Sequence, residues 1–426
     1  MGGPDPGGAT PLTAPLRRGL RPVTEQTRVT TAELFFDVVF VFAFIQVTTL
    51  MTGGTNELGV LHGLLVLTML WWSWSLFAWL GNRVRANYGC VRLVLLATVP
   101  VMFVLAVNTR EAFRDAPGGG PYTPTVFVAT FFVLRLFYLA LRLYASTPLR
   151  ARDAVALTVP MLLAVGLLLI AARLPGSGLD DATVRWGQVA LWVLAIGVDY
   201  GAALALPVPE RAIFSARHWT ERHSLIIIVA LGEVLVSIGI AGADIPNSRG
   251  LIEASALAVV VAAALEWIYL DLSALVGEHA LRDADQHGRV GLARDAYSYL
   301  HLPMIAGIIL LAAGLKHVPA LVGAAPAHHR GDPLDAFGRY AMYGGVALYL
   351  LAHAMFQLRL NRLVLPVVWP RLVAVLVLLV MVPLTARISA LAALGWLAVI
   401  CTVTAVTEFV VSRGPRHHLR NALNEE

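Results

Sequence analysis

The sequence is poor in charged residues, in lysine and in cysteine. Charged side chains make up 14% of the 426 residues and hydrophobic ones 58%, whereas soluble globular domains carry about 25% charged residues. This balance excludes an ordinary soluble protein. Lys316 is the only lysine, and the arginines form no long basic run and no aromatic–basic array. We therefore expect no nucleic-acid partner.

Motifs for a metal, a cofactor or a catalytic nucleophile are also missing. Cys90 and Cys401 are the only cysteines and lie far apart, without the spacing of metal ligands. Neither a disulfide framework nor a metal site is therefore predicted. No phosphate-binding loop, nucleophile elbow or His-Glu-x-x-His motif occurs. We predict no catalytic residues and no cofactor, and an enzyme is the less favoured interpretation.

What the sequence does contain is a series of apolar segments long enough to cross a bilayer. About 20 apolar residues suffice for a transmembrane helix, and the ~10-residue alternating segments of a transmembrane barrel are absent. We predict an all-α polytopic membrane protein, surrounded by lipid, with about twelve transmembrane helices. The expected spans are residues 33–52, 60–80, 91–109, 122–145, 153–173, 185–206, 222–241, 252–275, 295–315, 337–358, 370–388 and 390–411.

Arginines predict the orientation of these spans. They occur in the N-terminal tail, in every second connector and in the C-terminal tail, whereas residues 52–59, the first connector of the opposite set, contain no basic residue. Because cytoplasmic segments are enriched in arginine and lysine, both termini are predicted to lie in the cytoplasm. Residues 1–27 have no hydrophobic core and make a poor signal peptide. We therefore expect the first span to be an uncleaved anchor in the plasma (inner) membrane.

The two halves of the chain are weakly similar to each other. Aligning the first span with the seventh sets Ala43 against Ala230 and Gln46 against Glu233. Six spans per half would give a 6+6 parallel internal repeat, as in several transporters; chance similarity between hydrophobic helices is the alternative. The expected divisions are a disordered cytoplasmic tail at 1–30, six-helix repeats at 31–206 and 207–411, and a cytoplasmic tail at 412–426.

Two of the spans carry carboxylates that demand an explanation. Glu33 and Asp37 lie four residues apart at the start of the first span, so on a helix they share one face. Glu233 lies deep in the seventh span. Ionised side chains within a membrane cost about 2.5–3.5 kcal/mol each on insertion scales and usually face protein or water. We expect Asp37 and Glu233 to line one central cavity between the first and seventh helices.

Further ionisable residues fall within the predicted spans. We expect them to converge on the same polar interior, with the acids facing an arginine and two histidines. The full set of predicted substrate- or ion-binding residues is Glu33, Asp37, Arg135, Asp199, Glu233, Glu266, His301 and His353.

The acids and histidines of this set also have a purely structural interpretation. Glu33 stands at a helix N-terminus, where the helix dipole favours a carboxylate. Asp37 and Glu233 could form buried ion pairs or hydrogen bonds that hold helices together. Asp199 and Glu266 have tyrosines nearby that could supply local hydrogen bonds, and the two histidines could be satisfied core residues.

Tryptophans and glycines mark two further features. The four tryptophans between residues 71 and 79 are typical of an interfacial aromatic belt and packing surface, with ligand stacking as the alternative. Gly232 and Gly239 lie seven residues apart and share a helix face, so another helix is expected to approach closely there.

The first and seventh spans carry motifs that resemble those of the bacterial low-temperature-requirement protein A family. The motifs are Glu33-Leu34-Phe35-Phe36-Asp37 followed by Val39-Phe40-Val41-Phe42-Ala43, and Glu221-Arg222-His223 followed by Ala230-Leu231-Gly232-Glu233. Ser224 stands where the pattern often has glycine. The resemblance covers nearly the whole chain. It implies a multi-span inner-membrane protein whose loss is linked to poor growth in the cold, and it implies no substrate or chemistry.

We therefore expect a secondary transporter or an ion-conducting protein. Its intramembrane carboxylates would bind a small cation, a proton or a small solute, with Arg135 and the histidines tuning their charge. The alternative is a non-transporting membrane protein needed for growth in the cold. That protein would be an intramembrane enzyme acting on lipid, a sensor, or a scaffold stabilised by internal ion pairs.

Overall fold

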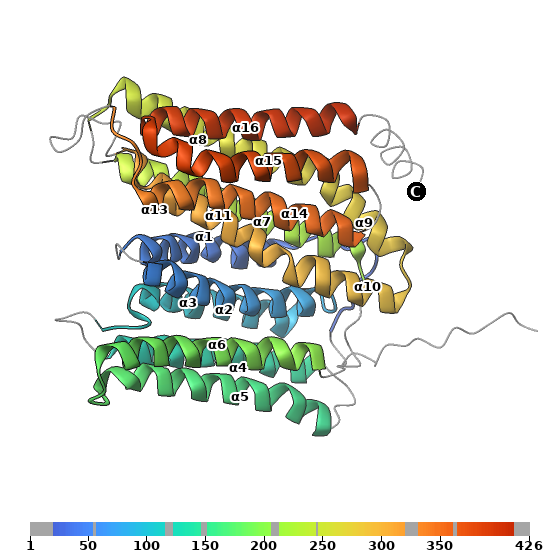
Figure 1. Ribbon diagram of the computed structural model, residues 1–426. Helices are drawn as coiled ribbons and strands as arrows, with labels where there is room; N and C mark the ends of the chain where they lie inside the picture. The colour runs from blue at the N-terminus through green and yellow to red at the C-terminus, as the bar shows by residue number, and fades with distance from the viewer. Residues whose placement is uncertain are drawn as a thin grey trace, which may run out of the picture.

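The computed structural model describes residues 20–53, 57–115, 122–145, 151–205, 213–243, 246–319, 331–360 and 364–412. These residues form a bundle of long helices that contains no strand. Twelve helical stretches among them are long and apolar enough to cross a membrane. The prediction of an all-α polytopic protein with twelve spans is therefore confirmed. In Figure 1 the helices run side by side across the view, from α16 at the top to α5 at the bottom.

The first six spans are formed by continuous helices with short 3-10 turns at two of their ends. Their bounds are α1 (Thr31–Thr52), α2 (Glu57–Gly81), α3 (Gly89–Val107) with η1 (Asn108–Glu111), α4 (Thr123–Ala145), α5 (Ala151–Arg173) with η2 (Leu174–Gly176), and α6 (Asp181–Ala205).

The last six spans are less regular, because π-helical turns interrupt three of them. The π-helical turns are η3 (Tyr269–Ser273), η4 (Ala293–Tyr299) and η5 (Tyr340–Gly344). The helices are α7 (Ala216–Gly242), α8 (Arg249–Ile268), α9 (Ala274–Asp283), α10 (Gln286–Leu292), α11 (His301–Leu315), α13 (Ala336–Arg339), α14 (Gly345–Leu360), α15 (Val364–Leu384) with η6 (Thr385–Arg387), and α16 (Ala390–Val411).

Short polar side chains begin the helices that matter most for the candidate site. Thr30 caps α1 reciprocally with Glu33, and Ser215 caps α7 by accepting from the His218 N–H group. Such caps satisfy backbone N–H groups that have no partner within the helix. The cap at Ser215 starts α7 at Ala216 rather than at the predicted residue 222. Arg222 therefore lies in the second turn of the helix and not at its first residue.

Helices in the two halves have the same order of neighbours. In the first half α1 packs on α2 and α3, α4 lies between α3 and α5, and α5 packs on α6. In the second half α7 packs on α8 and α11, α14 lies between α11 and α15, and α15 packs on α16. The first helices of the halves, α1 and α7, pack against each other in the middle of the bundle. This is the arrangement that a 6+6 repeat requires, and the repeat itself stays a prediction.

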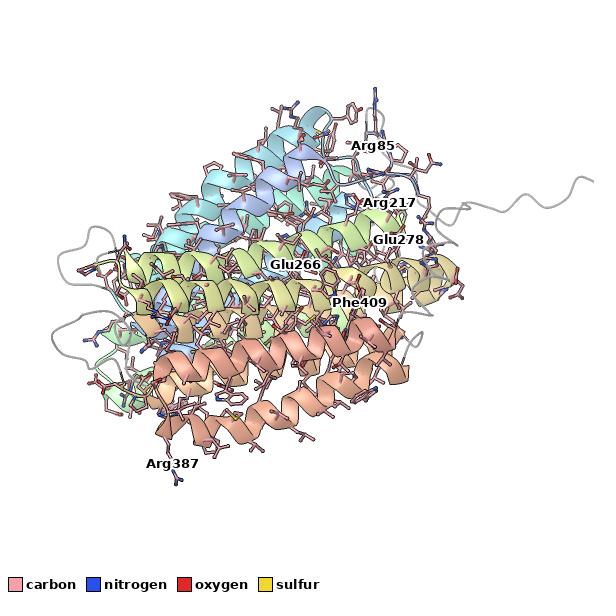
Figure 2. All side chains as sticks on the ribbon, turned by 90° about the horizontal axis from the view of Figure 1, so that it is seen from above. Arg85, Arg217, Glu266, Glu278, Arg387 and Phe409 are labelled. Carbon is pink, nitrogen blue, oxygen red and sulfur yellow. The ribbon has the colours of Figure 1, made fainter. Side chains whose placement is uncertain are left out.

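The first and last spans begin and end on the same side of the bundle. The start of α1 lies beside the start of α7, because His218 contacts Glu33, and in Figure 1 α16 ends on that same side. We call this side the near end and the opposite side the far end. Figure 2 shows Arg85 and Arg217 at one end of the bundle and Arg387 at the other. That the near end is cytoplasmic stays a prediction from the arginines.

Residues 20–30 lie against the near end and hydrogen-bond to it. The Val23 N–H group donates to the Arg83 carbonyl at 3.2 Å, and the Arg85 N–H group donates to the Arg21 carbonyl at 3.0 Å. The Glu25 carboxylate accepts the Ala216 N–H group at 3.2 Å. The rest of the predicted N-terminal tail, residues 1–19, and residues 413–426 lie outside the described residues.

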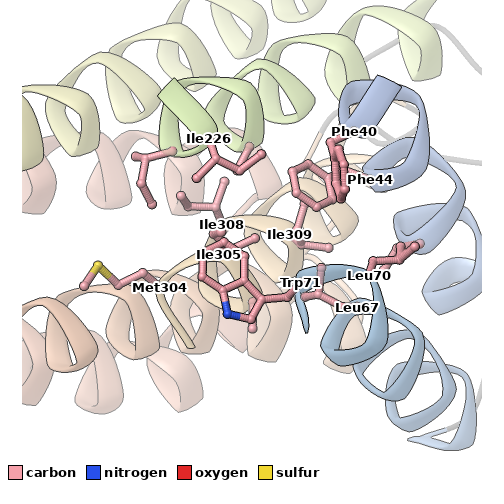
Figure 3. Packing of buried hydrophobic residues seen from close by; sticks show 14 of the residues in the cluster. Phe40, Phe44, Leu67, Leu70, Trp71, Ile226, Met304, Ile305, Ile308 and Ile309 are labelled. Atoms are coloured by element: carbon pink, nitrogen blue, oxygen red, sulfur yellow. The ribbon is translucent and has the colours of Figure 1, made fainter. Parts of the chain in front are cut away.

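The middle of the bundle is apolar. Here α1, α2, α7 and α11 meet in a set of tightly packed side chains, each with 1% or less of its surface exposed (Figure 3). We call this set the apolar layer: Phe40, Phe44, Leu67, Leu70, Ile226, Ile305, Ile308 and Ile309. Trp71 and Trp74 on α2 are also buried, at 2% and 0% exposed. They pack inside the bundle, which agrees with the predicted packing surface and not with an interfacial belt.

Candidate functional site

Five buried side chains from three helices form an ionic cluster at the near end. We call Glu33, Asp37, Trp74, His218 and Arg222 the near cluster. His218 Nε2 lies 3.0 Å from Glu33 Oε1, and Arg222 Nη1 lies 3.6 Å from the same oxygen. Arg222 Nη2 and Trp74 Nε1 both donate to Asp37 Oδ1, at 2.9 and 2.8 Å. The cluster therefore ties α1 to both α2 and α7.

The tautomer of His218 follows from the hydrogen bonds around Asn82. The Asn82 Oδ1 accepts the backbone N–H groups of Phe214 and Ser215, so its amide nitrogen must face the other way. That nitrogen donates to the Ser215 carbonyl at 2.7 Å and lies 3.2 Å from His218 Nδ1. His218 Nδ1 is then the acceptor, and Nε2–H points at Glu33.

Some polar atoms of the near cluster have hydrogen-bond partners, and others have none among the described residues. Glu33 Oε2 accepts both the N–H group and the hydroxyl of Thr30, at 2.9 and 2.8 Å. Asp37 Oδ2 and the Nε and Nη1 groups of Arg222 have no hydrogen-bond partner among the described residues. A cavity of about 20 Å³ borders Glu33 and Arg222, which is room for about one water molecule.

A second, smaller cluster lies at the far end. We call Thr48, Glu233, Ser237 and Lys316 the far cluster. Glu233 Oε1 accepts the hydroxyls of Thr48 and Ser237, each at 2.6 Å. Lys316 Nζ donates to Thr48 Oγ1 at 2.6 Å and lies 3.9 Å from Glu233 Oε1. Glu233 is fully buried, and its Oε2 has no partner among the described residues.

Lys316 is the member of the far cluster that lies beyond the end of its span. It follows α11 directly, and its side chain is 16% exposed. Burial lowers the pKa of Lys316 from the ordinary value of 10.5, while the Glu233 carboxylate acts to raise this pKa. The Arg110 guanidinium, on η1, lowers the Lys316 pKa further. The ammonium group thus meets one carboxylate and one competing cation.

The structure does not bring Asp37 and Glu233 into one cavity. Glu233 bonds to Thr48, which is eleven residues beyond Asp37 on α1, or about 16 Å along a helix that rises 1.5 Å per residue. The apolar layer fills the space between these two levels, with Phe40 and Phe44 on α1 and Ile226 on α7. The two carboxylates belong instead to separate clusters at opposite ends of one interface.

Arg135 and Asp199 form a third site, away from the carboxylates of α1 and α7. Arg135 Nη2 on α4 donates to Asp199 Oδ1 on α6 at 2.8 Å, and both residues are buried. The expected contact of Arg135 with the other acids is therefore not present. Tyr200, the neighbour of Asp199, donates to the Thr68 carbonyl at 3.1 Å rather than to the acid.

The two predicted histidines are buried core residues; His301 has a partner at both ring nitrogens, whereas His353 Nδ1 has none among the described residues. His301 Nδ1 donates to the Ala296 carbonyl at 3.0 Å, so its Nε2 accepts the Tyr269 hydroxyl at 2.7 Å. His353 Nε2 lies 2.8 Å from Ser273 Oγ, and the ring of Tyr269 packs between the two histidines. Glu266 is half-buried on α8 and is not a member of either cluster.

Several members of the clusters were not predicted from the sequence. Arg222 is the first residue of the predicted seventh span and belongs to the Glu221-Arg222-His223 motif, but it is not among the predicted binding residues. Lys316 carried a signal as the only lysine, placed directly after an apolar run. Thr48 and His218 gave no signal, because a hydroxyl or a histidine near a span end is ordinary.

Comparisons with known proteins agree with the motifs on α1 and α7. The family described as bacterial low temperature requirement A protein (LtrA) matches residues 28–406. An uncharacterized protein of Rhizobium meliloti (strain 1021) is 27% identical over an alignment of 408 residues, and the match covers 94% of this chain and 92% of that protein. No solved structure matches the chain.

Proposed function

The chain belongs to the family of bacterial low temperature requirement A proteins, and from that premise we propose that it is a secondary transporter with alternating access. Its moving parts would be the two six-helix halves, which meet where α1 packs against α7. Glu233 would be the group that takes up and releases a coupling proton. The solute would be small, and each half-cycle would open one end of the α1–α7 interface while the other stays closed.

The observation that carries this proposal is the pair of polar clusters on one interface. The near cluster joins α1 to α7 through Glu33, Asp37 and Arg222. The far cluster joins the same two helices through Thr48 and Glu233. Alternating access needs separable contacts on both sides of a central barrier. One cluster at each end supplies such contacts.

The apolar layer favours a transporter over an open channel. It closes the interface between the clusters with side chains that are almost completely buried, such as Phe40, Phe44 and Ile309 (Figure 3). An ion that crossed this layer without a conformational change would lose its hydration and meet no polar group in exchange. Passage therefore requires the helices to move.

Glu233 is placed so that its charge state changes the contact between the halves. Thr48 on α1 and Lys316 after α11 both approach the same carboxylate oxygen. When the carboxylate is ionised, the Lys316 ammonium attracts it and the hydroxyl bonds are charge-assisted. A proton on the open Oε2 oxygen would weaken these contacts. The proton would thereby release the far end.

A second candidate function is a non-transporting scaffold or sensor, favoured by the near cluster. Glu33 and Asp37 are buried and paired in a way that is common for residues that fix helix positions. Removing one partner of such a pair typically costs about 3–5 kcal/mol. On this reading, neutral variants would lose folded protein, whereas a transporter variant would fold and fail to move solute.

A flux experiment tests the proposal. Purified protein is reconstituted in voltage-clamped liposomes containing a pH-sensitive dye, and gradients of small carboxylates, phosphate esters and monovalent cations are imposed. We expect at least one gradient to drive proton movement in the wild type, and Glu233→Gln to lower that rate at least tenfold. Glu253→Gln is the matched control, because Glu253 is partly exposed on α8 and forms an ion pair with Arg249. Equal rates in wild type and Glu233→Gln would contradict the proposal, and no movement in any gradient would favour the scaffold.

A further inference from the structure

A pocket of about 100 Å³ lies at the near end, outside both clusters. Its walls come from α2, α4, α5 and α6 of the first half and from η4 of the second half. We propose that this pocket binds a phosphate group, carried either by a small soluble phosphate ester or by the headgroup of an anionic lipid. The proposal concerns binding at equilibrium and does not depend on the transport mechanism.

Arg135 supplies the first argument for an anion. Its residue is 6% exposed, and it lines the pocket with its partner Asp199. Asp199 takes one of the guanidinium nitrogens, while Nε and Nη1 donate to no acceptor among the described residues. Buried donors without acceptors are costly, and donors on a cation more so. An oxyanion in the pocket would accept these N–H groups.

The charge of the lining supplies the second argument. Four arginines and one carboxylate, that of Asp199, line the pocket, and Arg294 among them pairs with the neighbouring Asp295. A phosphate monoester carries about −1.5 to −2 charges at neutral pH and offers three acceptor oxygens. The arginines are Arg83, Arg135, Arg142 and Arg294.

The depth and walls of the pocket limit the ligand. Arg142 lies toward the near end of α4 and Arg135 lies seven residues earlier, which is about 10 Å deeper along the helix. Trp72 and Trp79 provide apolar wall between these levels. A volume near 100 Å³ admits a phosphate group with a short organic remainder, and excludes a nucleotide or a whole lipid. Only the headgroup of a lipid would enter.

Removing Arg135 alone would leave Asp199 buried without its cation, so the pair must be neutralised together. The double variant Arg135→Gln/Asp199→Asn removes both charges and keeps side chains of similar size. The chain offers a matched control in Arg371 and Glu408. These residues form another buried ion pair, with 2.7 Å between Arg371 Nε and Glu408 Oε1, and neither of them lines the pocket. Arg371→Gln/Glu408→Gln should disturb folding in a similar way while leaving the pocket intact.

Binding is measured with the full chain in nanodiscs of phosphatidylcholine, by calorimetry with glycerol 3-phosphate and by native mass spectrometry after adding phosphatidic acid. We expect one of these two probes to bind the wild type and the Arg371/Glu408 variant. The Arg135/Asp199 variant should bind it at least tenfold more weakly. Binding of glycerol 3-phosphate would identify a soluble ester, and retention of phosphatidic acid alone would identify a lipid headgroup. The inference is overturned if neither probe binds, if benzoate binds in their place, or if the Arg135/Asp199 variant binds as the wild type does.

Discussion

Asp37 and Arg222 are the pair in which a structural role can be measured most directly. Replacing Asp37 by leucine leaves the Arg222 guanidinium buried without its 2.9 Å partner, and breaking a buried pair in this way costs about 3–5 kcal/mol. The double variant Asp37→Asn/Arg222→Gln should recover part of that loss, since it removes the buried guanidinium together with its partner, while Glu33 keeps its hydrogen bonds to Thr30 and its contact with His218. Unfolding in mixed micelles gives both free energies. A single variant as stable as the wild type would show that the near cluster does not hold the helices.

The burial of Lys316 predicts that the free energy of unfolding rises with pH in the alkaline range. Burial holds the pKa of Lys316 in the folded protein below its ordinary value of 10.5. Between the folded and ordinary pKa values the unfolded chain binds more protons, so the free energy of unfolding rises with pH across that interval. Below that interval the ammonium is charged in both states, and the cost of burying it is present in full.

The measurement compares the wild type with Lys316→Met. The melting temperature of the wild type should increase relative to that of the variant as pH is raised from neutral toward 10.5. All other titrating groups are shared by the two proteins, so the difference between their curves isolates Lys316. Parallel curves would contradict the claim that the ammonium is buried at a cost.

Single residues also mark the limit of reading the sequence. Because ionised side chains are costly in a membrane, we predicted that Glu33, Asp37 and Glu233 face protein rather than lipid, and all three are buried. Their partners could not be predicted, because a pairing such as Asp37 with Arg222 depends on where α7 begins and how it is rotated. Both were decided by the Ser215 cap and by the packing of α1 on α7.

Among the helices, the crossing of α11 and α14 depends on two glycines. A Cβ atom added to Gly307 would lie 2.5 Å from the Gly345 carbonyl oxygen and 2.7 Å from the Tyr349 backbone nitrogen. Backbone atoms cannot move aside as a flexible side chain can. Gly307→Ala should therefore destabilise the protein by about 1–3 kcal/mol, as other overpacked positions do.

Gly395 in α16 provides the control for this prediction. A Cβ atom there meets nothing within 4 Å among the described residues, and alanine is favoured over glycine within helices by about 0.5–1 kcal/mol. Gly395→Ala should leave the stability unchanged or raise it slightly. Both variants are compared by thermal unfolding in the same micelles. Equal effects of the two substitutions would contradict the close crossing.

The spacing of residues in the sequence predicted where the helices lie better than it predicted which helices contact each other. Gly232 and Gly239 share a face, as predicted, yet a Cβ atom at either would meet nothing within 4 Å among the described residues. Gly307 and Gly345 have no such spacing within one helix, since the close approach is made between helices. The periodicity of one helix carries no information about which neighbour covers it.

For the whole molecule, the arginine distribution predicts the orientation. Reporter fusions after Gly53 and after Arg152 should report opposite sides of the membrane, with Arg152 in the cytoplasm. The reason is that Gly53 ends α1 at the far end, whereas Arg152 lies at the start of α5 at the near end. Equal signals from the two fusions would contradict the topology. Opposite signals with the Arg152 fusion reporting the outside would place the near end outside the cell.

Fold class and span number followed from apolar length alone, because a bilayer imposes nearly the same length on every span. The expectation of one shared polar interior was wrong. The free-energy cost of placing a charge in lipid predicts that the acids are buried in protein, but it does not predict how many clusters they form. The apolar layer that separates Asp37 from Glu233 is built from phenylalanines and isoleucines. In the sequence these look the same as residues that face lipid.

The most direct test of alternating access is hydrogen exchange of the protein in nanodiscs, comparing wild type with Glu233→Gln and with Asp37→Asn/Arg222→Gln. Glu233→Gln weakens the far cluster, so the backbone around Thr48 and Lys316 should exchange faster while the start of α1 exchanges more slowly than in the wild type. The Asp37/Arg222 variant should show the reverse pattern. Exchange that rises at both ends in either variant, or changes only beside the substituted residue, would contradict the account.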